Sequence, residues 1–296
     1  MKTFVTTLII MASMTAAAQS QQITGVSSNQ KAPEKVEKIA SSPGDVAAVA
    51  ECIYCYDLLN GDKRSTGAAM LQIAPSVARF IDYTSFATDS LRRSGDTDRE
   101  QFNRFLSREL RCESFIDQTI LQGFPSGKMT VISPIAPNLY TYTETAYPLP
   151  WTLAGEVDTI AGYECHKATA TYGGRDWTAW YTTEVPVSFG PWKLTGLPGL
   201  VVKAASNDGV HSFILTTLRQ GSSVIPTTIP RTAVTTSRDK FVKLKNEFEK
   251  DPWNNILPES ITDITVVNTE GGKPLMLING TPFHPYPDGY VPFEQE

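Results

Sequence analysis

The sequence has 296 residues, of which 41% are hydrophobic and 19% are charged, and its formal net charge is −5 at pH 7. A chain of this length is long for one domain but suits a β-rich one. Its basic residues form no stripe along the sequence, which argues against nucleic acid as a partner.

The N-terminus has the features of a secretory signal peptide. Lys2 precedes an apolar run from Phe4 to Met14, and small residues continue to Ala18. The run is too short to cross a bilayer, and no other segment has the roughly 18 apolar residues that a membrane span needs. We therefore expect residues 1–18 to be cleaved near Ala18, which leaves a soluble periplasmic or secreted protein.

The remaining chain divides by composition into a leader and a domain. Residues 19–48 are mostly polar, and we interpret them as a disordered leader. Residues 49–296 are predicted to form a single β-rich domain. Within it, residues 221–296 make a less typical C-terminal extension that contains one helix.

The chain has four cysteines, Cys52, Cys55, Cys112 and Cys165. An exported chain meets an oxidising compartment, so disulfides are expected. The CIYC motif at Cys52 and Cys55 reads as part of a strand, where residues three apart point to opposite faces with Cα atoms roughly 10 Å apart. Because a disulfide needs Cα atoms within about 7 Å, we expect no redox pair here. Pairing of Cys52 or Cys55 with Cys112 or Cys165 is favoured, and three connectivities stay open.

Most of the chain reads as short strands separated by turn signals such as NGDKRSTG. The predicted strands are 51–58, 68–73, 77–83, 128–135, 139–144, 156–160, 163–172, 175–183, 200–205, 211–218, 264–267 and 275–278. The pattern favours a mainly β fold (a β-rich α+β class), built as an antiparallel half-open barrel or curved sheet with a few packing helices.

Two segments have helical periodicity. Residues 98–110 place Phe102, Leu106 and Leu110 on one face. Ser237 is a suitable N-cap for a second amphipathic helix that runs to Lys250. The proline-rich and aromatic tail that begins at residue 283 is expected to be irregular.

The strand predicted at 175–183 has large side chains on both faces. Strand alternation places Arg175 and Trp177 on one face and Trp180 on the other. Such a strand is either covered on both sides or lines a groove whose apolar wall accepts a ligand.

Residues 190–203, GPWKLTGLPGLVVK, fit a pair of tight corners better than a ligand loop. The LPGL segment matches a type II turn, in which the proline sets φ at the second position and Gly199 takes the positive φ at the third. The glycine spacing matches neither the dinucleotide fingerprint nor the phosphate loop. The residues assigned to these corners are Gly190, Pro191, Gly196, Leu197, Pro198, Gly199 and Leu200.

Residues 162–203 resemble the signature region of the GLPGLI family of exported proteins from Bacteroidota. The matching positions are Gly162-Tyr163, Cys165, Lys167-Ala168, Gly174-Arg175, Trp177, Ala179-Trp180, 184–186, Gly190-Pro191-Trp192-Lys193 and the GLPGLV segment. The resemblance extends over about residues 50–220. It implies an exported β-rich fold and no particular reaction, and members of the family look like partners of outer-membrane transport systems. The layout is also similar to a half-open LolA-like lipoprotein carrier, an analogy of fold that does not fix function.

No catalytic set, metal site or cofactor site is recognised. His166, His211 and His284 lack metal-ligand spacing, no GxSxG motif is present, and Glu144, Glu156 and Glu184 read as ordinary charges beside strands. Arg175 is open to two interpretations, because its guanidinium could stack on an indole or hold a ligand carboxylate.

The sequence therefore favours a non-enzymatic binding or carrier protein, accessory to an outer-membrane transport or assembly system. Its concave sheet would hold a hydrophobic small molecule, a lipid or a peptide segment, with Arg175, Trp177, Trp180 and Trp192 as the binding residues. The alternatives are a hydrolase with an unrecognised active site and a structural assembly factor at the outer membrane. A carboxylate pair or a Cys–His pair in a pocket would favour the hydrolase.

Overall fold

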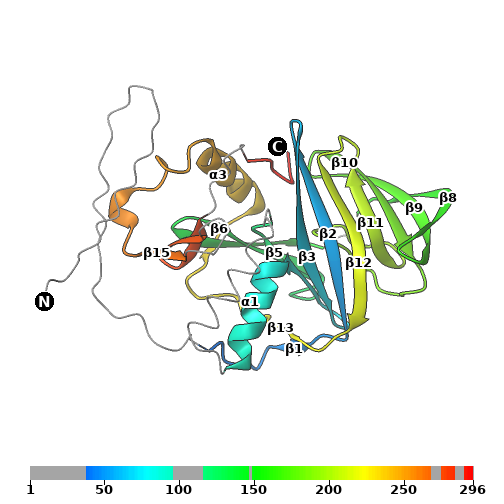
Figure 1. The fold of residues 1–296 in the computed structure, drawn as a ribbon, viewed down its shortest axis with the longest axis horizontal. Coiled ribbons are helices and arrows are strands. Elements are labelled where there is room, and N and C mark those ends of the chain that lie inside the picture. The colour runs from blue at the N-terminus through cyan, green and yellow to red at the C-terminus, as the bar shows by residue number, and fades with distance from the viewer. Residues whose placement is uncertain (1–37, 96–115, 147–148, 268–274, 284–289, 296) are drawn as a thin grey trace, which may run out of the picture.

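The computed structural model describes residues 38–95, 116–146, 149–267, 275–283 and 290–295 (Figure 1). The strands are β1 (Val46–Ala47), β2 (Ala50–Asn60), β3 (Lys63–Ile73), β4 (Ala78–Asp82), β5 (Thr119–Gln122), β6 (Lys128–Ile135), β7 (Asn138–Thr145), β8 (Thr152–Ile160), β9 (Tyr163–Tyr172), β10 (Arg175–Thr182), β11 (Leu200–Ser206), β12 (His211–Gln220), β13 (Val224–Ile225), β14 (Val234–Thr235), β15 (Ile264–Val267), β16 (Leu275–Ile278) and β17 (Thr281–Phe283). The helices are α1 (Tyr83–Ser94), α3 (Arg238–Lys250) and the 3-10 turn η1 (Pro258–Ser260). The predicted signal peptide, most of the leader, the helix at 98–110, Cys112 and His284 lie outside the described residues.

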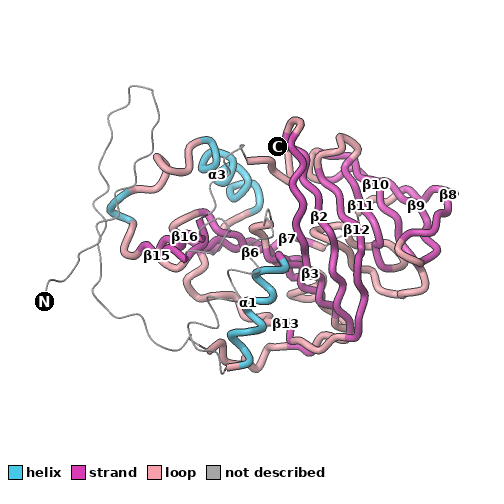
Figure 2. The backbone as a smooth tube through the Cα atoms, in the orientation of Figure 1, coloured by secondary structure: helices cyan, strands magenta, loops and turns pink. Residues whose placement is uncertain are grey.

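Twelve of the strands form one sheet in the order β14-β7-β6-β5-β4-β3-β2-β12-β11-β10-β9-β8. The neighbours pair antiparallel except β14 and β7, which pair parallel. The order runs from the edge strand β14 to the edge strand β8, and these two edges do not pair with each other. The predicted fold class is thereby confirmed, since the chain is mainly β and its large curved sheet stays open instead of closing into a barrel (Figure 2).

Alternation along the strands puts one face of the sheet in the core, as the sequence predicted. In β2, Cys52, Tyr54 and Tyr56 are buried and Cys55 points to the other face. This confirms that the CIYC motif lies on a strand, with its two thiols on opposite faces.

The main hydrophobic cluster fills the concave side of the sheet and draws on nearly every strand. Phe241 and Phe248 of α3 also belong to it, so this helix covers part of the concave face. Figure 1 shows α3 and α1 lying to one side of the long strands β2, β12 and β11. Helix α1 packs on the opposite face of β3 and β4, where Phe86 joins Met70 and Ile81 in a separate small cluster.

Two local predictions near the N-terminal strands need correction. The predicted turn NGDKRSTG is shorter than expected, because β3 already begins at Lys63 and only Gly61 and Asp62 form the hairpin loop. The strand continues there because the Asp57 carboxylate accepts hydrogen bonds from Arg64 and Thr66 on the neighbouring strand.

The strand predicted at 77–83 gives way at its end to the unpredicted helix α1. The Asp82 carboxylate accepts a hydrogen bond from the backbone N–H of Ser85 and caps the helix N-terminus. The helix predicted after Ser237 is confirmed as α3.

The expected disulfide to Cys165 is not formed. Cys52, Cys55 and Cys165 form no disulfide with one another, and Cys112 lies outside the described residues. In the sheet order, β2 and β9 are separated by β12, β11 and β10, and each neighbouring strand adds about 4.8 Å. This separation explains why Cys165 is out of reach, while a bridge to Cys112 stays a prediction.

Within the described ranges, the helices are too short or too polar to span a membrane.

Candidate functional site

The GPWKL segment enters the concave core instead of turning at the surface. Trp192, Lys193 and Leu194 are buried there, with Trp192 in a left-handed backbone conformation at φ 53°. The Gln122 amide donates to the carbonyls of Gly190 and Trp192, at 2.8 and 2.5 Å, and so anchors the segment to β5. The predicted corners do exist, but they deliver side chains into the core.

The predicted type II turn at LPGL is wrong in its detail. The positive φ belongs to Gly196, at 94°, and Gly199 is not among the residues with positive φ. Gly199 is needed for a different reason, because a Cβ atom there would lie 2.0 Å from the carbonyl oxygen of Thr182. The glycine thus allows the segment to pass close to the end of β10.

Three of the four residues predicted to bind a ligand come together on the concave face. Trp177 and Trp192 are fully buried, with ring centroids 5.4 Å apart. Arg175 lies on the same face of β10, whereas Trp180 is half-buried on the opposite face. The sequence predicted this division by alternation, and the binding role of these residues stays a prediction.

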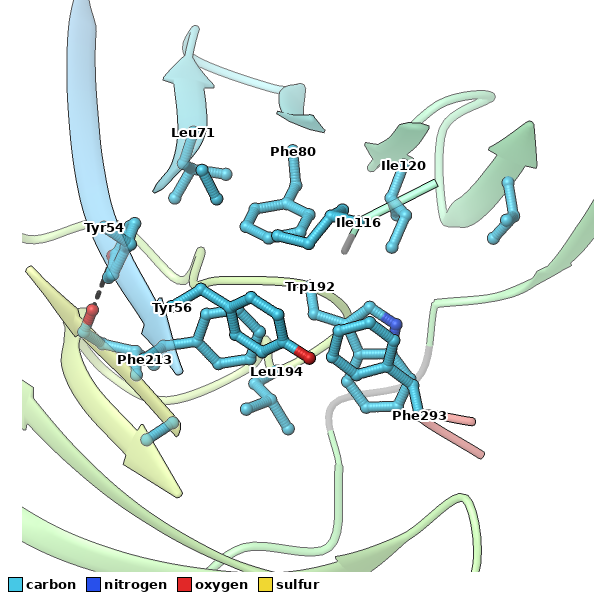
Figure 3. Packing of buried hydrophobic residues seen from close by; sticks show 14 of the residues in the cluster. Tyr54, Tyr56, Leu71, Phe80, Ile116, Ile120, Trp192, Leu194, Phe213 and Phe293 are labelled. Carbon is cyan, nitrogen blue, oxygen red and sulfur yellow. Dashed lines mark hydrogen bonds between the residues drawn. The ribbon is translucent and has the colours of Figure 1, made fainter. Parts of the chain in front are cut away.

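Residues 290–295 lie against these side chains without forming a helix or strand. The ring of Phe293 stacks on His211 at 4.5 Å and on Trp192 at 5.2 Å, and the ring of Tyr56 is 5.6 Å away (Figure 3). Figure 3 shows Phe293 and Trp192 facing each other at the centre of the buried cluster. We call residues 290–295 the C-terminal segment.

Arg175 binds the backbone of the C-terminal segment. Its guanidinium donates to the carbonyl of Pro292 at 2.9 Å and to that of Phe293 at 3.2 Å, and it also contacts the Asp208 carboxylate. Its buried position therefore serves the recognition of main-chain carbonyls in this structure.

His211 contacts the same Pro292 carbonyl as Arg175. Burial, assisted by the positive charge of Arg175, lowers the pKa of His211 to about 4, so the ring is neutral at pH 7. Its Nε2 lies 3.1 Å from the Pro292 carbonyl, which can only accept, so Nε2 carries the proton. Nδ1 then accepts from the hydroxyl of Tyr56 at 2.9 Å.

A buried ion cluster holds the side chain of Glu294. Lys193 Nζ lies 2.5 Å from Glu294 and 2.7 Å from Glu144, and it donates to the Tyr142 hydroxyl at 3.0 Å. Arg238, at the start of α3, contacts Glu294 as well. Burial alone would lower the pKa of Lys193, but the carboxylates of Glu294 and Glu144 raise it above its ordinary value.

Taken together, these groups form a receptor for an extended segment. The site binds an aromatic ring by stacking, two main-chain carbonyls by Arg175 and His211, and one carboxylate by Lys193 and Arg238. Lys193 is charged and already contacts two carboxylates, so it is not poised as a nucleophile. Among the described residues, no three histidine, cysteine or acidic side chains are grouped so that they could hold a metal ion.

Sequence reasoning missed the charged half of this site. Glu144 was read as an ordinary charge beside a strand, but it is mostly buried and pairs with Lys193. Lys193 has no predicted role and lies between the two predicted corners, and Phe293 and Glu294 belong to the predicted irregular tail. The usable signal was a single lysine inside the otherwise apolar WKL run, because a lysine buried in such a run needs an acidic partner.

Comparison with known proteins gives a local match in sequence. Residues 172–203 match the model of a Bacteroidota-associated family described as a protein of unknown function (Porph_ging). No sequence among curated proteins matches the chain.

Similar solved structures include PNGF-II in two crystal forms, at 12% and 14% identity and a TM-score of 0.47 in each. The alignment covers 67% of this chain and 33% or 32% of PNGF-II, so the chain spans about a third of that protein's length. A DUF1329 family protein from Desulfovibrio piger follows, at 7% identity and a TM-score of 0.19, with 59% of this chain and 86% of that chain covered. A putative outer membrane lipoprotein-sorting protein domain from Vibrio parahaemolyticus has 10% identity and a TM-score of 0.18, with 60% and 85% covered. TM-scores below 0.5 are too low to transfer a fold or a function to this chain.

Proposed function

We propose that this chain is an exported, non-enzymatic binding protein whose concave face receives an extended peptide segment with an aromatic and an acidic side chain. The observation that carries the proposal is the way the C-terminal segment is held there. Its carbonyls, its ring and its carboxylate are each recognised by side chains of the sheet and of the GPWKL segment. Recognition of a segment by backbone contacts plus side-chain pockets is a common mode of peptide binding.

In this proposal, the C-terminal segment occupies the site until a partner segment of similar chemistry replaces it. The aromatic residues Trp177 and Trp192 act as anchors, and Arg175 contributes to backbone recognition. The resemblance of residues 162–203 to the GLPGLI family, together with the signal-like N-terminus, supports export and service to an outer-membrane transport or assembly system.

The test uses the hexapeptide VPFEQE, which has the sequence of residues 291–296. The full-length double variant Phe293→Ala with Glu294→Gln loosens the chain's own segment. We expect this variant to bind the labelled peptide at least about tenfold more tightly than the wild-type chain does, because internal competition is reduced. Fluorescence anisotropy measures the affinity.

The control peptide VPAQQE lacks the ring and the acidic group that the site recognises, and it should not bind. The proposal is wrong if the folded double variant binds neither peptide, or binds both equally. Near-UV circular dichroism establishes that the variant is folded. If the double variant is not folded, the single variant Glu294→Gln, which keeps the ring, is used instead. It should again bind VPFEQE more tightly than VPAQQE.

A further inference from the structure

A cavity of about 320 Å³ lies beside β4 and β5, and Gln118 in its wall accepts a hydrogen bond from the Trp192 indole at 3.0 Å. Arg79, Ile81 and Leu121 line it, and they alternate along these strands with Phe80 and Ile120, which belong to the concave core. Because successive strand residues point to opposite faces, most of the strand residues in the cavity wall belong to the convex face of the sheet. The cavity therefore lies mainly on the opposite side of the sheet from the C-terminal segment, and Gln118 joins the two regions.

The cavity has the size and the wall of a small-molecule site. Pockets that bind small ligands have volumes of roughly 300–1,000 Å³, are mostly apolar and contain a few placed polar groups. Ile81, Leu121 and Ile132 supply an aliphatic wall, and Pro226 and Pro230 supply a stiff one from the segment that follows β13.

Arg79 is the polar group with spare hydrogen-bonding capacity. It is buried, its Nη2 lies 2.5 Å from Asp89 and its Nη1 lies 3.4 Å from the side-chain oxygen of Gln72. Its Nε has no hydrogen-bond partner within the described part of the chain. A guanidinium has five N–H donors, so two acceptors leave donors unused, and unused buried donors are unfavourable.

The cations beside the cavity are already paired with carboxylates. Asp89 compensates Arg79, and Lys245 lies 2.6 Å from Asp117, which also lines the cavity, and 2.8 Å from Glu249. A charged ligand would add an uncompensated charge to this partly buried space, which is strongly unfavourable. An uncharged oxygen would accept a hydrogen bond from Arg79 without disturbing that balance.

We propose that this cavity binds a small neutral molecule with an apolar body and one hydrogen-bond-accepting oxygen, such as a ketone or an ester. The apolar body packs against the isoleucine, leucine and proline side chains, and the oxygen accepts from Arg79. This inference does not rest on the proposed peptide site, because the two lie mainly on different faces of the sheet.

Three eight-carbon probes separate the contributions of the acceptor oxygen, the ligand charge and the apolar chain: 2-octanone, octanoate and n-octane. Isothermal titration calorimetry on the full-length chain should give saturable one-to-one binding of 2-octanone. We expect octanoate and octane to bind about tenfold more weakly or worse, since one adds a charge and the other lacks an acceptor. Tighter binding of octanoate than of the ketone would overturn the neutral class, and binding of none of the three would overturn the site.

Two variants locate the binding. Leu139 lines the cavity and is half-buried, so Leu139→Phe should fill part of the space and reduce 2-octanone binding at least about tenfold. The matched control Leu153→Phe makes the same change at an exposed position of β8 and should leave binding unchanged. Equal binding by both variants would contradict the assignment. Arg79→Lys keeps the charge but removes the Nε–H group that has no partner and reduces the N–H donors from five to three, so it should reduce the preference for ketone over alkane.

Discussion

At the scale of single residues, the site depends on groups that burial has forced into one state. His211 is neutral because its ring is enclosed by Phe293, Trp177 and Tyr56. Lys193 stays charged because Glu144 and Glu294 lie within ion-pair distance. The hydrogen bonds that hold the C-terminal segment follow from these two fixed states.

The neutral state of His211 predicts how stability depends on pH. The folded ring has a pKa of about 4, whereas an unfolded histidine titrates near 6.5. Between these values the unfolded chain binds a proton that the folded chain does not, so stability falls as the pH falls from 6.5 to 4. The loss from this group is about 3 kcal/mol.

Urea unfolding at several pH values measures this effect. In His211→Asn, the free energy of unfolding should no longer fall by this amount between pH 6.5 and 4. The variant also has a lower stability at every pH, because it lacks a stacked ring. His166→Asn is the matched control: His166 is only half-buried, beside Tyr181 near the start of β9, so this variant should keep the wild-type dependence of stability on pH. An unchanged dependence of stability on pH in His211→Asn would show that the ring is already protonated in the fold.

At the scale of elements, the sequence predicted the bounds of several regular strands but did not predict the helix that begins where β4 ends. The strands at 128–135 and 163–172 have the predicted bounds, because their alternation meets one buried face and ends at glycine or proline turns. Helix α1 was missed because Phe80-Ile81-Asp82-Tyr83 continues a strand-like apolar run up to its first residue. Only the local hydrogen bond of Asp82 shows that the chain begins a helix there.

The two helix starts offer a matched test of capping. Asp82 caps α1 through Ser85 N–H at 3.0 Å, whereas Ser237 at the start of α3 makes no side-chain capping hydrogen bond. Asp82→Ala should therefore reduce the free energy of unfolding by about 1 kcal/mol. Ser237→Ala should change it by less than about 0.5 kcal/mol. Urea titrations of both variants measure the difference, and an equal effect would show that the hydrogen bond at Asp82 contributes nothing.

At the scale of the whole molecule, the central strands of the sheet are paired on both sides, whereas the edge strand β8 is paired on one side and is mostly exposed to solvent. Strands β2 and β3 pair along their full length, and β2 is flanked by β12 on its other side. In contrast, β8 is an edge strand, mostly exposed on both faces, and its pairing with β9 is interrupted between Leu153 and Val157. Stability should therefore decrease along the sheet toward β8.

Amide hydrogen exchange followed by mass spectrometry tests this gradient. Peptides from β2, β3 and β12 should exchange slowest, and those from β8 should exchange fastest among the strands of the large sheet. If β8 were as protected as β2, its free edge would be covered in solution, for example by a second copy of the chain.

The open sheet could be predicted from the sequence, but its occupied concave face could not. Strand alternation predicts that a side chain such as Trp177 points toward the core, but it does not predict which segment packs against that side chain. Phe293 and Glu294 reach their partners across long separations in the chain, and no local pattern encodes such contacts. The aromatic face that looked like an empty groove is filled by a segment whose sequence resembles an irregular tail.

The position of Phe293 also governs the order of events during synthesis. The ribosome makes Tyr56 early and Phe293 late, yet the two rings finish as neighbours. Contacts between such distant positions form slowly, because a long loop must close before they can contribute. A nascent chain that ends before Pro292 leaves His211 without one of its three stacked rings and Arg175 without the carbonyls of Pro292 and Phe293. The concave core is therefore completed only when the last residues of the chain have been made.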